Sequence, residues 1–149
     1  MRYTGRENTK ALPRETGGAA AIWKGRTTMP DITAVTHAQN IRYDRKAEAL
    51  YIIDQTLLPG EEKEIRLQTI DEMVEAIRAL RVRGAPAIGI CAAYCMYVLA
   101  KSIRTEDRPT FLKRLSDYGQ QLDAARPTAV NLGWAIREMM RTALEHVHD

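Results

Sequence analysis

The first regular pattern of apolar and polar positions begins at residue 41 and predicts a small antiparallel sheet. Residues 41–43 form a short first segment, and a polar turn separates them from the apolar, partly β-branched residues 49–54. Such an apolar run is typical of a strand buried on both faces. Leu58-Pro59-Gly60 ends this run, and residues 62–67 then alternate polar and apolar positions like a strand with one solvated face. We therefore expect three strands.

From residue 69 onward the apolar spacing is that of helices. Thr69 and Glu72 form a capping box that opens a helix with one apolar stripe. The residues after Pro86 are apolar on nearly every face, which predicts a helix buried among others. Two more helices are predicted from the apolar positions of residues 111–122 and 130–147. The fold class expected is α+β, with a three-stranded antiparallel sheet followed by a bundle of about four helices.

Residues 81–89 join the first two predicted helices with almost no spacer. Gly84 permits backbone angles that a side chain would forbid, and Pro86 suits the first turn of a helix. The second helix therefore begins with free N–H groups directly after Arg83, whose planar guanidinium matches phosphate or carboxylate oxygens. One interpretation is an anion site, and the other is a tight helix–helix corner with a solvated arginine.

A second corner of the same design lies at residues 126–132, where Arg126 and Pro127 precede another predicted helix start. Two such corners in one small domain can converge on a single anionic ligand, because each presents an arginine and free backbone donors. Whether they converge depends on the tertiary structure, which spacing alone does not reveal.

Composition and charge distinguish the amino-terminal end from the rest of the chain. The 149 residues are 45% apolar and 28% charged, which is typical of one globular domain. Residues 1–30 hold six Lys or Arg against two Glu, so the net charge of +3 comes from this stretch and the remainder is nearly neutral. This distribution gives no reason to expect nucleic-acid binding. We expect an irregular basic tail at residues 1–36, disordered or untranslated if Met29 is the true start, and a domain at residues 37–149.

Cysteine and histidine form no recognisable site. Cys91 and Cys95 lie one helical turn apart and are expected to be small apolar core residues, and so few cysteines indicate a reducing, cytoplasmic compartment. His37, His146 and His148 lack the further ligands that a zinc site needs. The small residues and two tyrosines after Pro86 favour a core helix over a membrane span. We expect no metal, no cofactor and no membrane partner.

The string Arg83-Gly84-Ala85-Pro86-Ala87-Ile88-Gly89, followed by Arg126-Pro127-Thr128-Ala129-Val130-Asn131-Leu132, resembles the methylthioribose-1-phosphate isomerase family. Residues 41–43, 50–55 and 57–59 are similar to the opening strands of that family, so the resemblance runs from near residue 40 to near residue 145. It implies an aldose–ketose isomerase of methionine salvage, which converts 5-methylthioribose 1-phosphate to 5-methylthioribulose 1-phosphate. It also implies that the complete protein is a homodimer.

The resemblance implies four substrate-binding residues, Arg83, Gly84, Ala85 and Arg126. The proton-transfer residues of the family are a cysteine and an aspartate in a second, nucleotide-fold-like domain. No residue of this chain matches either of them, so we expect no catalytic residue here and no activity from this chain alone. Cys91 and Cys95 stand where the family usually has alanine and glycine. Gly133 replaces a large side chain, which predicts looser packing around Trp134.

Two other classes of protein share the architecture of this family. The regulatory subunits of the translation initiation guanine-exchange factor are binding proteins, and archaeal ribose-1,5-bisphosphate isomerase is another sugar-phosphate enzyme. The joint presence of both arginine motifs favours the methylthioribose enzyme. Binding of a small sugar phosphate rather than a protein partner would separate the classes, and an inactive fragment is a third alternative.

Overall fold

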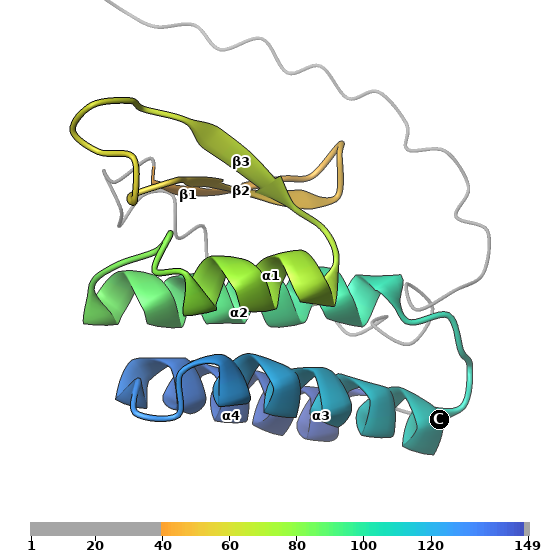
Figure 1. Ribbon diagram of the computed structural model, residues 1–149. Helices are drawn as coiled ribbons and strands as arrows, with labels where there is room; N and C mark the ends of the chain where they lie inside the picture. The colour runs from red at the N-terminus through yellow and green to blue at the C-terminus, as the bar shows by residue number, and fades with distance from the viewer. Residues whose placement is uncertain (1–39, 148–149) are drawn as a thin grey trace, which may run out of the picture.

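The computed structural model describes residues 40–147, so the tail predicted at residues 1–36 lies outside the described part of the chain. Three strands come first and four helices follow (Figure 1). The elements are β1 (Ile41–Asp44), β2 (Ala49–Ile53), β3 (Glu64–Leu67), α1 (Ile70–Arg78), α2 (Ala85–Ser102), α3 (Arg108–Ala125) and α4 (Val130–His146). All three strands belong to one antiparallel sheet in the order β1-β2-β3, which confirms the predicted α+β class.

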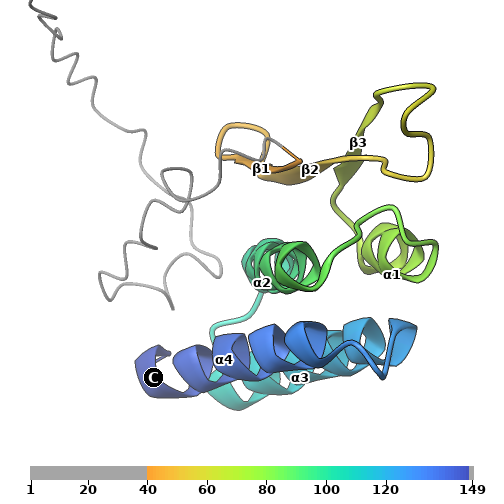
Figure 2. The same cartoon turned by 90° about the vertical axis from the view of Figure 1, so that its left-hand side faces the viewer.

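The elements stack in three layers. The sheet lies over α1 and α2, and α3 and α4 lie on the opposite side of those two helices (Figures 1 and 2). Helix α2 occupies the middle and contacts β1, β2 and the other three helices. By length and composition this helix could cross a membrane, but half of it is buried inside the fold, as in a core helix. Its apolar character on nearly every face is explained by neighbours on both sides.

One expectation for the central strand is wrong. Leu50 and Ile52 on the inner face of β2 are buried, but Tyr51 and Ile53 on the outer face are only half-buried. No layer of described residues covers that face, which is closed in part by Arg42, whose guanidinium lies 4.4 Å from the centre of the Tyr51 ring. Strand β2 is therefore apolar on a face that is partly open, rather than buried on both faces.

Two buried glycines on α3 and α4 lie against different neighbours. A Cβ atom added at Gly119 would lie 2.9 Å from Cγ2 of Ile136, inside the core. At Gly133 it would meet only the ends of flexible side chains, Asp123 Oδ1 at 2.9 Å and Arg137 Nη1 at 3.1 Å. Trp134 beside Gly133 is 58% exposed, and looser packing around it remains a prediction.

We predict opposite effects of alanine at these two positions. Gly133→Ala should raise the free energy of unfolding by about 0.5–1 kcal/mol, because alanine favours the helix and the neighbouring polar side chains can move aside. Gly119→Ala should lower it by about 1 kcal/mol, because overpacking against Ile136 outweighs the same gain in helix propensity. Urea unfolding of both variants measures the effects. A change of the same sign in both would contradict this account of the packing.

Candidate functional site

The first arginine corner begins with an unusual end to α1. Leu80 adopts a positive φ of 61°, although it is not glycine. The amide of Arg81 donates to the Ala76 carbonyl at 2.9 Å, and the Leu80 amide donates to Ile77 at 3.3 Å. This is the Schellman arrangement that usually ends a helix at glycine. The chain therefore turns sharply at Leu80, and Arg81 is directed back toward the sheet.

Helix α2 begins with exposed and uncapped backbone donors, as predicted. Gly84 is the N-cap with φ of 91°, no side chain caps the helix, and its first turn holds no acidic residue. The Gly84 carbonyl accepts the first helical hydrogen bond from the Ile88 amide at 3.0 Å. Gly84 and Ala85 are both exposed. The free N–H groups and the positive end of the helix dipole therefore face an open surface.

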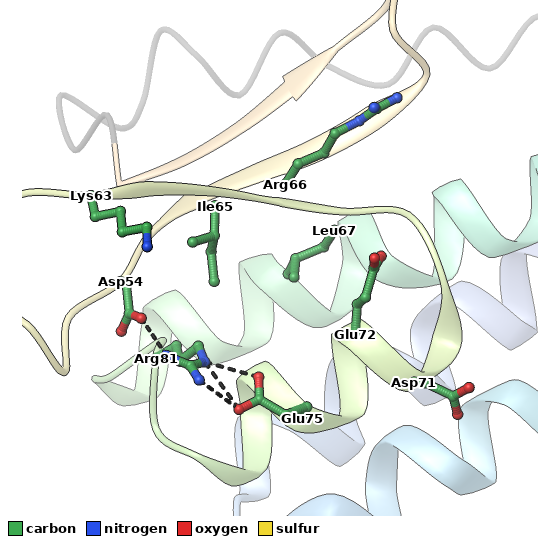
Figure 3. Close-up of a pocket in the computed structure, with 9 residues that line it drawn as sticks. All are labelled: Asp54, Lys63, Ile65, Arg66, Leu67, Asp71, Glu72, Glu75 and Arg81. Carbon is green, nitrogen blue, oxygen red and sulfur yellow. Dashed lines mark hydrogen bonds and ion pairs between the residues drawn. The ribbon is translucent and has the colours of Figure 1, made fainter.

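Arg83 and Arg81 have different roles in this corner. The exposed Arg83 donates from Nε to the Leu80 carbonyl at 3.3 Å, and no carboxylate among the described residues pairs with it. Arg81 is engaged by two carboxylates, since it pairs with Asp54 and donates to Glu75 at 2.7 Å (Figure 3). Arg83 is therefore available to an anionic ligand, whereas Arg81 is a structural residue.

Asp54 is buried, with 2% of the whole residue exposed. Burial alone would raise the pKa of Asp54, but hydrogen bonds from the Thr56 hydroxyl at 2.6 Å and the Thr56 amide at 3.0 Å, together with Arg81, outweigh it and lower the pKa. The hydrogen bond to Glu75, followed by that to Asp54, raises the pKa of Arg81. Both groups are therefore charged at neutral pH. The sequence holds one signal that could have indicated the Asp54–Arg81 pair, because the carboxylate of Asp54 lies at the end of an apolar strand.

An open groove of about 500 Å³ lies between β3, α1 and the Asp54–Arg81 pair (Figure 3). Its charged side chains are four carboxylates, Asp54, Asp71, Glu72 and Glu75, and three cations, Lys63, Arg66 and Arg81. None of the four predicted binding residues lines it. The excess of carboxylates makes this groove unsuitable for a phosphate, so it is separate from the predicted anion site.

The second corner has a looser geometry than the sequence predicts. Arg126 ends α3, and its amide donates to the Asp123 carbonyl at 3.1 Å. Helix α4 does not follow Pro127 directly, because a turn closed by the Ala129 amide on the Arg126 carbonyl at 2.9 Å comes first. The helix begins at Val130, with Ala129 as an N-cap that has no side-chain hydrogen bond. Its first amides are free, as at α2.

The structure brings the two corners to the same end of the bundle. Helices α2 and α4 begin at that end, and α3 runs in the opposite direction (Figure 1). The two motifs touch where a Cβ atom at Gly89 would lie 3.2 Å from the Asn131 carbonyl oxygen. Arg126 is half-buried and, like Arg83, has no carboxylate partner among the described residues. The two uncapped helix starts therefore lie at one end of the bundle, and each follows an arginine that has no carboxylate partner among the described residues.

Gly89→Val should disturb this pairing of helix starts. The valine side chain would press on the backbone of Asn131, which cannot rotate aside as a side chain can, so we expect a loss of about 1–3 kcal/mol in unfolding free energy. Chemical denaturation measures the loss, and Ala87→Val on the half-buried face of the same helix is the control. Equal stability of Gly89→Val and the parent chain would show that α2 and α4 do not approach closely at this point.

Cys91 and Cys95 are buried and unpaired, with their sulfur atoms 3.9 Å apart, which confirms the prediction of core residues. The hydrogen bond that the Cys95 thiol shares with Cys91, together with burial, raises the pKa of Cys95, so its thiol is protonated and unreactive. Within residues 40–147, no group of three His, Cys, Asp or Glu side chains is arranged to hold a metal ion. His37 and His148 lie outside the described residues.

Comparison with known proteins gives a consistent picture. Residues 81–149 match the model of the initiation factor 2 subunit family. Over 94 residues the chain is 51% identical to a methylthioribose-1-phosphate isomerase of Crocosphaera subtropica, covering 63% of this chain and 27% of that protein.

Two crystal structures have a similar fold. One is 5-methylthioribose 1-phosphate isomerase from Pyrococcus horikoshii, with a TM-score of 0.68 and 34% identity over 74% of this chain and 30% of that one. The other is subunit delta of translation initiation factor eIF-2B from A. fulgidus, with a TM-score of 0.60 and 30% identity over 72% of this chain and 35% of that one. The chain thus spans about a third or less of each relative's length. From the matched motifs, the sequence identity and the shared fold, we conclude that residues 81–149 carry an initiation factor 2 subunit family domain and that the chain is similar to methylthioribose-1-phosphate isomerases.

Proposed function

We propose that this chain supplies the phosphate-binding part of an aldose–ketose isomerase acting on 5-methylthioribose 1-phosphate in methionine salvage. The observation that carries the proposal is the meeting of two uncapped helix starts, α2 and α4, at the close approach of Gly89 and Asn131. Each start is preceded by an arginine that no described carboxylate neutralises. The proposed reaction converts 5-methylthioribose 1-phosphate to 5-methylthioribulose 1-phosphate.

The phosphate of such a substrate would be held from two sides. The Arg83 guanidinium and the free amides of Gly84 and Ala85 would donate from the α2 corner, and Arg126 would donate from the α4 corner. Charge-assisted hydrogen bonds of this kind fix the sugar relative to the groups that move its protons. Gly84 matters because a side chain at its positive φ would be strained, and because it leaves the amides open to the ligand.

The hydrogen transfer between the two sugar carbons needs an acid or base that the four binding residues do not supply. We propose that a further domain of the complete protein supplies it, in a homodimer located in the cytoplasm. The chain alone should therefore bind the substrate and not convert it.

A non-enzymatic regulatory subunit is the alternative function. The likeness to subunit delta from A. fulgidus, at 30% identity, is the observation that favours it. On that alternative the surface at the start of α2 and α4 would bind protein, and 5-methylthioribose 1-phosphate would have no special affinity for it.

A chimera tests the proposal. The matching 94 residues of the Crocosphaera subtropica isomerase are replaced by those of this chain, and isomerisation of 5-methylthioribose 1-phosphate is measured. We expect kcat/KM within about tenfold of the parent enzyme, because the arginines and helix starts would be present in both. A folded chimera without activity would reject the isomerase function and favour the regulatory one.

A further inference from the structure

Asp54 and Gln55, directly after β2, contact the short segment 81–83 that leads into α2. We propose that Gln55 is a positioning residue of the anion site, which fixes the Arg83 backbone and thereby the direction of the Arg83 side chain and the α2 amides. This inference rests on the proposed function. It adds a residue that acts through Arg83 and does not itself contact the ligand.

Gln55 holds the segment through two hydrogen bonds. Its backbone amide donates to the Arg81 carbonyl at 3.0 Å, and its side-chain Oε1 accepts from the Arg83 amide at 3.1 Å. The held segment lies between Leu80 and Gly84, which both have positive φ angles. Because the chain turns sharply on both sides of this segment, few repeating hydrogen bonds define the path of its backbone. The contacts of Gln55 therefore determine the position of the Arg83 backbone.

The contacts of the neighbouring side chains hold the backbone of Gln55 in a fixed position. Asp54 pairs with Arg81, whose guanidinium also reaches Glu75 on α1 (Figure 3). Thr56 secures Asp54 through its hydroxyl and its amide. Gln55 thus stands between two residues that are themselves fixed, and its half-buried side chain is directed to the corner.

Holding the backbone matters because the side chain of Arg83 is otherwise lightly restrained. The hydrogen bond from Nε to the Leu80 carbonyl, at 3.3 Å, leaves both terminal nitrogens for a ligand. A fixed backbone lowers the ordering cost that binding would otherwise require. Loss of the Gln55 contact should therefore weaken anion binding although every residue that touches the anion is still present in the sequence.

The first test is amide hydrogen exchange in the 149-residue chain, followed by NMR. Gln55→Met keeps the volume but removes the acceptor, so exchange of the Arg83 amide should accelerate by about tenfold or more. Gln55→Glu should preserve the protection, because a carboxylate oxygen also accepts. The control is Gln68→Met, a half-buried glutamine whose side chain donates to the Ala47 carbonyl away from the corner. Unchanged Arg83 exchange in Gln55→Met would overturn the inference.

The second test uses inorganic phosphate as the probe. Gln55→Met should raise the dissociation constant of phosphate by about three- to tenfold, which is the range of one lost neutral hydrogen bond. Gln68→Met should leave this constant unchanged. If Gln55→Met fails to fold, Gln55→Asn provides the same test, because its shorter side chain does not reach the Arg83 amide. Equal affinity of the folded variant and the parent would overturn the positioning role.

Arg83→Ala separates the two proposals. Loss of phosphate binding in Arg83→Ala, with normal binding in Gln55→Met, would overturn only the positioning role. Phosphate binding that is absent from the parent chain, or that does not need Arg83, would overturn the proposed function and the ligand-related role of Gln55 with it. The exchange measurement contains no ligand, so it still shows whether Gln55 holds the corner.

Discussion

In the chimera described above, Arg83→Ala and Arg126→Ala are each expected to lower kcat/KM for 5-methylthioribose 1-phosphate by roughly 10- to 100-fold. On the proposed function, each substitution would remove a charged donor to the phosphate, and hydrogen bonds to charged groups contribute about 1.5–3 kcal/mol. If the site binds the phosphate equally in the ground state and the transition state, as we propose, much of the loss should appear as a higher KM. Steady-state kinetics measures both parameters.

The matched control is Arg104→Ala, which removes an exposed arginine just after the opposite end of α2. Its kinetics should stay within about twofold of the chimera, since it lies far from both helix starts. Neither Arg83 nor Arg126 forms an ion pair among the described residues, so their removal should leave the unfolding transition unchanged. Near-normal kinetics in both corner variants would rule out the proposed phosphate site.

Asp54→Ala should lower the free energy of unfolding by about 3 kcal/mol at neutral pH, because it breaks a buried ion pair. The substitution also leaves the Thr56 hydroxyl and amide without their acceptor. Glu75→Ala is the control, because Glu75 pairs with the same Arg81 but its side chain is 54% exposed, against 3% for Asp54. It should cost less than about 1 kcal/mol. Equal losses in both variants would show that burial does not strengthen the Asp54 pair.

The same carboxylate makes the chain sensitive to acid. Its pKa is lower in the folded chain than in the unfolded one, so the unfolded state binds protons first as the pH falls. The stabilisation is complete above the ordinary aspartate pKa of about 3.9, and is lost as the pH falls through the lower pKa of the folded state. Asp54→Ala should therefore show a weaker dependence of stability on pH below about 4 than the parent chain.

The elements of this fold were predictable because their signals are local. The Thr69–Glu72 capping box that predicts the start of α1 is present in the structure, and the apolar spacing of α2 follows directly from its place between two layers. The burial of β2 was overestimated, because an apolar run does not reveal that one face of the sheet lacks a covering layer. Tyr51 remains half-exposed there beneath Arg42.

The site was predictable only in part. Gly84 and Arg83 give a local signal, an exposed helix start after an arginine, and the structure has that geometry. The meeting of α2 and α4 at Gly89 and Asn131 depends on packing between residues far apart in sequence, so spacing could not reveal it. The contact from Gln55 to the Arg83 amide was missed for the same reason. Long-range contacts of this kind have no periodic pattern along the chain.

The most direct test of the central claim is an NMR titration of the 149-residue chain with 5-methylthioribose 1-phosphate. If both helix starts bind one phosphate, the amide signals of Gly84 and Ala85 on α2 and of Val130 and Asn131 on α4 should shift with a single dissociation constant. The unphosphorylated 5-methylthioribose should cause no such shifts. Shifts at only one helix start, or two different dissociation constants, would contradict the claim that the two corners form one site.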